Sequence, residues 1–205
     1  MAVHQFYKLQ CVFIISVFIS ACGVSSKKEV TTAALKKDNI CYILKKNPHW
    51  YRAVDKSAKE WNVSIPMIMA IMQRESGFKH NARPMGSQKQ GSKGKKKHLS
   101  SAYGYAQALD GTWKHYCKKT GRKLAKRDCF ADCAHFIGWY SSRSRSKCGI
   151  GKNDFYNHYL AYHEGHRGFN ERTHKNNKPL MRYAQTVALQ VRLFKHQLKE
   201  YKHKK

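Results

Sequence analysis

An unbroken apolar run from Ile65 to Met72 is followed, three residues later, by the carboxylate of Glu75. With Ser64 as an N-cap and Gly77 as a stop signal, the run predicts a buried helix that ends near Ser76. A carboxyl group in apolar surroundings loses hydration, which raises its pKa and suits it to act as a general acid near neutral pH. The alternative is a solvated charge at the end of a helix.

Helical periodicity recurs along the rest of the chain, and strand signals are scarce. We expect further helices over 49–61, 127–142, 153–164 and 180–200, and one that starts at Asp110 as a cap and runs to about Lys119. In the last of them, one stripe contains Tyr183, Val187, Val191 and Phe194. The fold class is therefore mainly α, a single domain. Two basic segments without an apolar period, 85–100 and 141–147, are predicted loops.

The N-terminus is typical of an exported protein. Cys11 to Ile19 is an apolar stretch too short to span a bilayer comfortably, and it ends in a sequence similar to a bacterial lipobox before Cys22. We expect a lipoprotein signal peptide over 1–21, lipidation at Cys22, a tether over 22–40 and a domain over 41–205. Lipoproteins that are retained in the inner membrane carry aspartate after the lipidated cysteine. This chain has Gly23 there, which favours the outer membrane. The alternatives are an ordinary secretory signal or a short membrane anchor.

Five cysteines lie beyond Cys22, at positions 41, 117, 129, 133 and 148. In an oxidising compartment they predict two disulfides and one free thiol, with pairing left open. Zinc at Cys129, Cys133 and His135 is the rival, but the spacing fits neither paired CxxC motifs nor a finger.

The net charge of +28 implies an anionic partner or surface. Peptidoglycan carboxylates, lipopolysaccharide phosphates and DNA all qualify, and charge alone does not choose among them. The basic loops lack the regular aromatic spacing of single-strand binders, so DNA remains a minor partner.

Three short motifs follow one another in order. They are Glu75-Ser76-Gly77-Phe78, the stretch from Ala102 to Thr112, and Ala161-Tyr162-His163-Glu164-Gly165. Together they resemble the lytic transglycosylase domain of the soluble-lytic-transglycosylase type, in glycoside hydrolase family 23 with the goose-type lysozymes. The family patterns are E-S-x-F, A-x-G-L-M-Q with a threonine five residues on, and A-Y-N-x-G. The likeness spans about residues 45–198 and implies a lysozyme-like domain with a catalytic groove.

The resemblance implies a role for each matching residue. Glu75 would be the single acid–base that cleaves the MurNAc–GlcNAc bond of peptidoglycan strands and leaves 1,6-anhydromuramoyl ends, without a cofactor. Substrate-binding roles would fall to Ser76, Gly104, Tyr105, Gln107, Tyr162 and His163.

The chain departs from the family pattern at several positions. Tyr105 and Ala106 replace Leu and Met, and His163 replaces Asn. Pro84 stands near the position of a serine that contacts the N-acetyl group, for which Ser100 or Ser101 is a candidate substitute. Glu164 raises the alternative of a second acid and a lysozyme-like hydrolysis.

Other function classes remain open from the sequence. A degenerate glycan binder, or a cationic protein for DNA or lipopolysaccharide, would need no catalysis. A metal site at His158, His163, Glu164 and His166 is not expected, because an HExxH motif would require a histidine where Arg167 stands. These histidines are expected to be solvated loop residues.

Overall fold

The computed structural model describes residues 38–84 and 100–203. The predicted signal peptide, Cys22, nearly all of the predicted tether and positions 85–99 of the basic insertion lie outside these residues.

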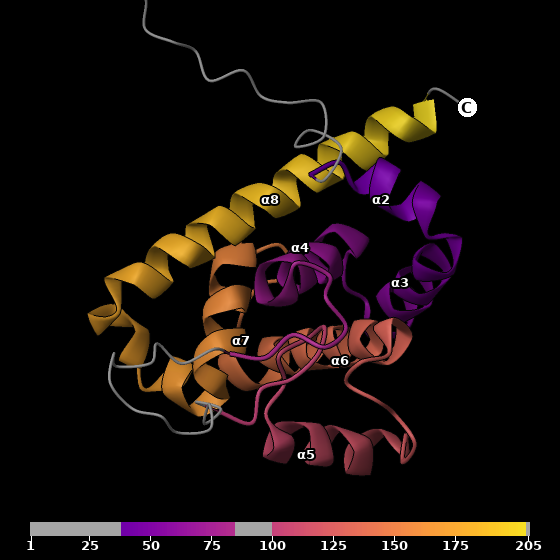
Figure 1. Ribbon diagram of the computed structural model, residues 1–205. Coiled ribbons are helices and arrows are strands. Elements are labelled where there is room, and N and C mark those ends of the chain that lie inside the picture. Colours follow the sequence, from indigo (N-terminus) through magenta and orange to yellow (C-terminus); the bar gives the residue numbers. More distant parts are fainter. Residues whose placement is uncertain (1–37, 85–99, 204–205) are drawn as a thin grey trace, which may run out of the picture. The chain divides into compact units, whose positions relative to one another are not determined.

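The described residues form helices joined by short connections (Figure 1). Within the described ranges there is no strand, only an isolated antiparallel bridge between Tyr103 and Ala108. The prediction of a mainly α fold is confirmed. Among the same residues, no helix combines the length and apolar content that a membrane span requires. The elements are α2 (Ile40–Lys46), α3 (Pro48–Trp61), α4 (Ile65–Ser76), α5 (Asp110–Thr120), α6 (Phe130–Cys148), α7 (Phe155–Asn170), the 3-10 helix η1 (Thr173–Asn176) and α8 (Lys178–His203).

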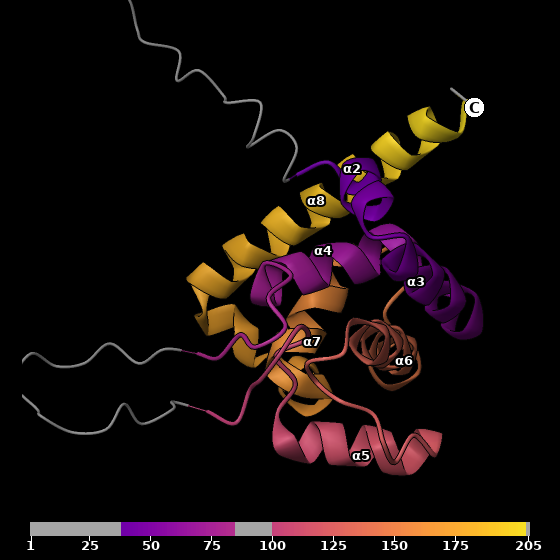
Figure 2. The same cartoon turned by 45° about the vertical axis from the view of Figure 1, so that its right-hand side comes forward.

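Helix α4 is the centre of the core. Every residue from Pro66 to Met72 is buried, and the helix packs against α3, α6 and α8. It lies between α8 and α6 in both ribbon views (Figure 2). The Ser64 hydroxyl accepts a hydrogen bond from the backbone N–H of Met67 at 3.3 Å, and Gly77 ends the helix with φ +57°. Both end signals predicted from the sequence are confirmed.

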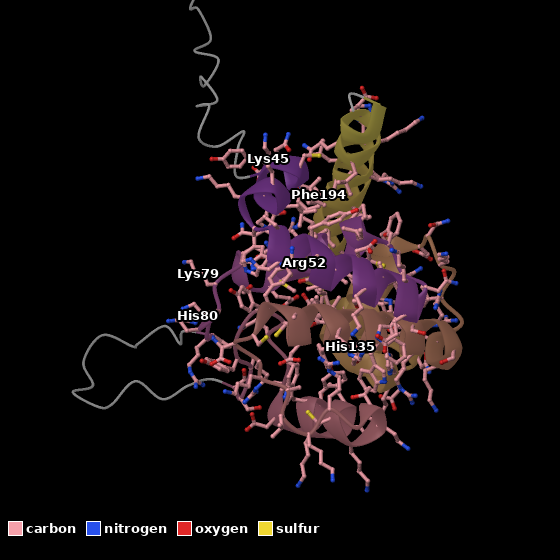
Figure 3. All side chains as sticks on the ribbon, turned by 90° about the vertical axis from the view of Figure 1, so that its right-hand side faces the viewer. Lys45, Arg52, Lys79, His80, His135 and Phe194 are labelled. Atoms are coloured by element: carbon pink, nitrogen blue, oxygen red, sulfur yellow. The ribbon has the colours of Figure 1, made fainter. Side chains whose placement is uncertain are left out.

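Helix α8 covers one side of this core. Its buried face is formed by Leu180, Ala184, Val187, Ala188, Val191 and Phe194. Phe194 is fully buried where α8 passes α2 (Figure 3). Three of the four residues in the predicted stripe lie on this face. Tyr183 does not: it is 46% exposed, and its ring stacks with the guanidinium of Arg74 at 3.7 Å.

The predicted loop at 141–147 is wrong, because α6 continues through it to Cys148. Ser141 and Ser144 are buried there, and the guanidinium of Arg145 donates to the carbonyl oxygens of Asn62 at 2.8 Å and Trp61 at 2.9 Å. These carbonyls end α3, where no further turn of helix supplies donors. These polar residues can lie in a packed helix because they are buried against other elements or hydrogen-bond to them. The hydrophobic pattern of residues 141–147 alone does not reveal such partners.

Several predicted helix ends move. Asp110 is the first residue of α5 rather than its cap, and its carboxylate forms an ion pair with Arg127 at 2.7 Å. Helix α7 runs to Asn170 across a kink at Gly165, whose φ of +76° favours glycine. Helix α2 is an additional short helix at the start of the domain.

The two predicted disulfides are absent from the structure. All five cysteines beyond position 37 are free, and three of the thiols contact backbone carbonyls on separate elements. Cys41 contacts the carbonyl of Gln197, Cys133 that of Arg127, and Cys148 that of His166. The prediction of disulfides is wrong because the fold distributes the cysteines over α2, α5 and both ends of α6.

We expect Arg145→Ala to lower the free energy of unfolding by about 1 to 3 kcal/mol, because two carbonyls at the end of α3 lose a charged donor. Urea denaturation followed by circular dichroism measures this. Lys147→Ala is the matched control, since Lys147 is exposed on the same helix. Equal stability of the two variants would contradict the role of Arg145.

Candidate active site

A cleft of about 320 Å³ opens beside the C-terminal end of α4. Three segments far apart in the sequence form its walls: the end of α4, the loop that precedes α5 together with the start of α5, and the middle of α7. Side chains of α6 close its floor. The lining residues are Glu75, Pro84, Ala102, Gln107, Ala108, Leu109, Thr112, Phe136, Tyr140, Tyr162, His163, Glu164 and Gly165.

Glu75 reaches this cleft from the last turn of α4. Its Oε1 atom is buried and has no hydrogen-bond partner among the described residues. Burial raises the pKa of Glu75, whereas a hydrogen bond from Tyr159 and the charges of His163 and Arg74 act in the opposite direction. Burial is the largest of these effects. The carboxyl group is therefore biased toward its protonated form.

The loop before α5 brings Gln107 to the cleft. Gln107 has a left-handed backbone, with φ +48°, and its Nε2 donates to the carbonyl oxygens of Ala82 at 3.0 Å and Gly104 at 2.7 Å. Because the amide nitrogen holds the loop, the amide oxygen is the part of this side chain that can accept from a ligand.

Arg127 fastens this loop from the segment before α6. Its guanidinium donates to the carbonyls of Ser101 at 2.8 Å and Ala108 at 2.9 Å, and its own carbonyl accepts from the N–H of Tyr105 at 3.1 Å. A Cβ on Gly104 would lie 1.9 Å from the Arg127 carbonyl oxygen, and the φ of Gly104 is +73°. Gly104 is thus required by the loop's own packing.

Helix α7 supplies the facing wall. The Tyr162 hydroxyl donates to the Ala106 carbonyl at 2.6 Å, which ties α7 to the loop. Burial raises the pKa of Tyr162 well above its ordinary value, so this hydroxyl stays a donor. The next residue, His163, has Nδ1 at 3.2 Å from Oε1 of Glu164, and the hydroxyl of Thr173 donates to the other oxygen, Oε2.

Four of the predicted site residues line the cleft together: Glu75, Gln107, Tyr162 and His163. Ser76, Gly104 and Tyr105 do not line it. The Ser76 hydroxyl is buried and donates to the Met72 carbonyl at 3.1 Å. Tyr105 instead packs beside Trp50 and Phe130, with ring centroids 6.0 and 5.5 Å away.

Among the described residues, no serine lines the cleft in place of the one that the motif pattern expects. Pro84 lines it, whereas Ser100 and Ser101 use their hydroxyl oxygens to accept from the N–H groups of Ala102 and Asp110. Their hydroxyls thus help to shape the loop.

Tyr159 and Thr173 act on the site but were not predicted from the sequence. Tyr159 lies one helical turn before Tyr162 and His163, so the i, i+3, i+4 spacing of α7 is a signal that points to it. Thr173 follows the kink at Gly165 and belongs to η1, and no local pattern connects it with Glu164.

The three histidines expected to be solvated loop residues all lie on helix α7, and of them only His163 is exposed. His158 is buried, and burial lowers its pKa to about 4. His166 stacks on Tyr140 at 4.4 Å and shares a hydrogen bond with Ser144 at 3.0 Å. Within the described residues no group of three or more His, Cys, Asp or Glu side chains is arranged to hold a metal ion.

Comparison with known proteins decides the family. Residues 10–201 match the model of the transglycosylase SLT domain family. The chain belongs to this family. No curated protein and no solved structure matches it. The SLT domain match identifies a lytic-transglycosylase-type enzyme that acts on peptidoglycan, and it starts within the segment predicted as a signal peptide.

The raised pKa of Glu75 predicts a pH-dependent stability. Between the ordinary glutamate pKa and the raised folded value, the unfolded chain is ionised and the folded chain is not, so stability falls as pH rises. We expect Glu75→Gln, which cannot ionise, to become progressively more stable than the unmodified protein as pH rises above about 4.3. Thermal unfolding of both proteins across this range measures the difference, and a difference that does not change with pH would contradict it.

Proposed function

We propose that this SLT-domain protein is a peptidoglycan lytic transglycosylase in which Glu75 is the general acid and base. The observation that carries the proposal is the carboxyl group of Glu75, which lines the same cleft as Gln107, Tyr162 and His163 and whose buried Oε1 has no partner among the described residues. A glycan strand bound there would meet a proton donor in surroundings that disfavour its ionised form.

The reaction begins when Glu75 donates its proton to the oxygen between N-acetylmuramic acid and N-acetylglucosamine. As that bond breaks, the anomeric carbon gains oxocarbenium character, which the acetamido group of the substrate supports. The muramoyl 6-hydroxyl then attacks the anomeric carbon, its proton returns to Glu75, and a 1,6-anhydro ring remains. Gln107 would accept a hydrogen bond from the glycan, and Tyr162 keeps α7 against the loop.

A hydrolysing muramidase is the second candidate, because Glu164 lines the same cleft. A retaining or inverting glycosidase uses a second carboxylate as nucleophile or base. Both oxygens of Glu164 already have partners, His163 and Thr173, which favours a supporting role for this carboxylate.

We also propose that the protein acts in the periplasm as a lipoprotein attached to the outer membrane through Cys22. The support is the sequence pattern before Cys22. Exposed lysines on and after α5 would hold the domain on an anionic mesh, and lipopolysaccharide or DNA could compete for the same surface. These are Lys114, Lys118, Lys119, Lys123 and Lys126.

Glu75→Gln is expected to lower the release of soluble products from purified sacculi by about 100-fold or more, since a positioned general acid contributes roughly 10² to 10⁴ to the rate. Mass spectrometry of the products separates the candidates. Anhydromuropeptides, one water lighter than reducing-end products, support the transglycosylase.

Glu171→Gln is the matched control, because Glu171 is exposed at the end of α7, outside the cleft lining, and pairs with Arg167. It should digest sacculi as the unmodified protein does. Reducing-end products would indicate the muramidase, and full activity of Glu75→Gln would refute the assignment of the acid.

A further inference from the structure

A chain of side chains runs from η1 through α7 toward Glu75. The Thr173 hydroxyl donates to Oε2 of Glu164, and Oε1 of Glu164 lies 3.2 Å from Nδ1 of His163. Arg172, with a left-handed backbone of φ +60°, precedes η1, and η1 packs against α7. A carboxylate that is itself held by a hydrogen bond fixes the orientation of the imidazole it contacts, and it also determines which ring nitrogen carries the proton.

The tautomer follows from the chemistry of the partner. An ionised carboxylate only accepts hydrogen bonds, so Nδ1 of His163 is the donor and carries the proton. Neutral His163 therefore has its lone pair on Nε2, at the opposite edge of the ring, and Nε2 has no hydrogen-bond partner among the described residues. His163 lines the cleft, so a base is available there.

Glu75 and this ring line one cleft. When His163 is charged, it lowers the pKa of Glu75. The other charged or titratable groups near the pair are Arg74 on α4 and Tyr159, Tyr162 and Glu164 on α7, with Tyr140 on α6. Of these, Glu164 is the carboxylate in contact with the imidazole.

Resting on the proposed function, we propose that His163 is a second catalytic residue, which relays the proton of the attacking hydroxyl group to Glu75, and that Glu164 and Thr173 position it. An asparagine at this place, as in the motif of the family, could hold a glycan but could not carry a proton.

The relay conserves atoms and charge. Glu75 gives its proton to the leaving glycan oxygen and becomes a carboxylate. The 6-hydroxyl oxygen bonds to the anomeric carbon, and its proton moves to Nε2 of His163. The resulting imidazolium keeps Glu164 on its Nδ1 side and shares the cleft with the newly ionised Glu75, and both negative charges stabilise it. Transfer of a proton from His163 to Glu75 then restores both groups.

The relay predicts the shape of the pH–rate profile. Protonated His163 cannot accept a proton, so activity should fall on the acid side of the profile. It should also fall on the alkaline side as Glu75 loses its proton. Removing the imidazole should abolish the fall of activity on the acid side of the profile (the acid limb) and leave the fall on the alkaline side.

The test compares His163→Asn, Glu164→Gln and Thr173→Val of the full protein in sacculus digestion, with kcat, KM and the pH–rate profile as readouts. We expect His163→Asn to lower kcat by about 10- to 100-fold with little change in KM, and to lose the acid limb. Glu164→Gln should lower kcat less and move the acid limb to lower pH, and Thr173→Val should act in the same direction more weakly.

His196→Asn is the matched control, because His196 is exposed on α8. Circular dichroism checks whether each variant is folded. If His163→Asn does not fold, the change in the acid side of the pH–rate profile of Glu164→Gln still tests the relay. An unchanged acid limb and kcat would overturn the relay, and a raised KM with unchanged kcat would make His163 a substrate-holding residue only. If Glu75→Gln stays active, the proposed function fails separately from the relay.

Discussion

The burial of helix α4 is the constraint on which the site depends. Because α4 is enclosed by α3, α6 and α8 along nearly its whole length, its last turn places Glu75 where one carboxyl oxygen has no partner among residues 38–84 and 100–203. Loss of hydration is then the dominant influence on this group, and it outweighs the stabilising contacts from Tyr159, His163 and Arg74. The same packing that stabilises the core therefore prepares an acid.

The cleft around this acid is assembled by cross-links rather than by one element. Arg127 and Gly104 fix the loop that carries Gln107, and the Tyr162 hydroxyl joins that loop to α7. Glu164 and Thr173 fix the orientation of His163 across the kink of α7. Each wall is thus held by hydrogen bonds between segments. Such bonds give a site that is built partly from loops a defined geometry.

The sequence predicted the features that depend on neighbouring residues, namely helix ends and apolar helix faces. Ser64 and Gly77 marked the ends of α4, and the apolar periodicity marked α3, α7 and α8. It failed at 141–147, where Arg145 and the buried serines find their partners on other elements, and at Tyr183, which stacks on Arg74 instead of entering the core. In the site, short motifs indicated Glu75, Gln107, Tyr162 and His163, but Thr173 reaches Glu164 only through a tertiary turn.

The most direct test of the account is a measurement of the ionisation of Glu75 itself. In protein labelled with ¹³C at glutamate carboxyl carbons, the Glu75 resonance, assigned by its loss in Glu75→Gln, can be followed by NMR from pH 3 to 8. If burial keeps the proton on Glu75, the midpoint lies clearly above the ordinary glutamate value of about 4.3. A midpoint at or below that value would mean that burial does not hold the proton on Glu75, and the general acid would have to be sought elsewhere.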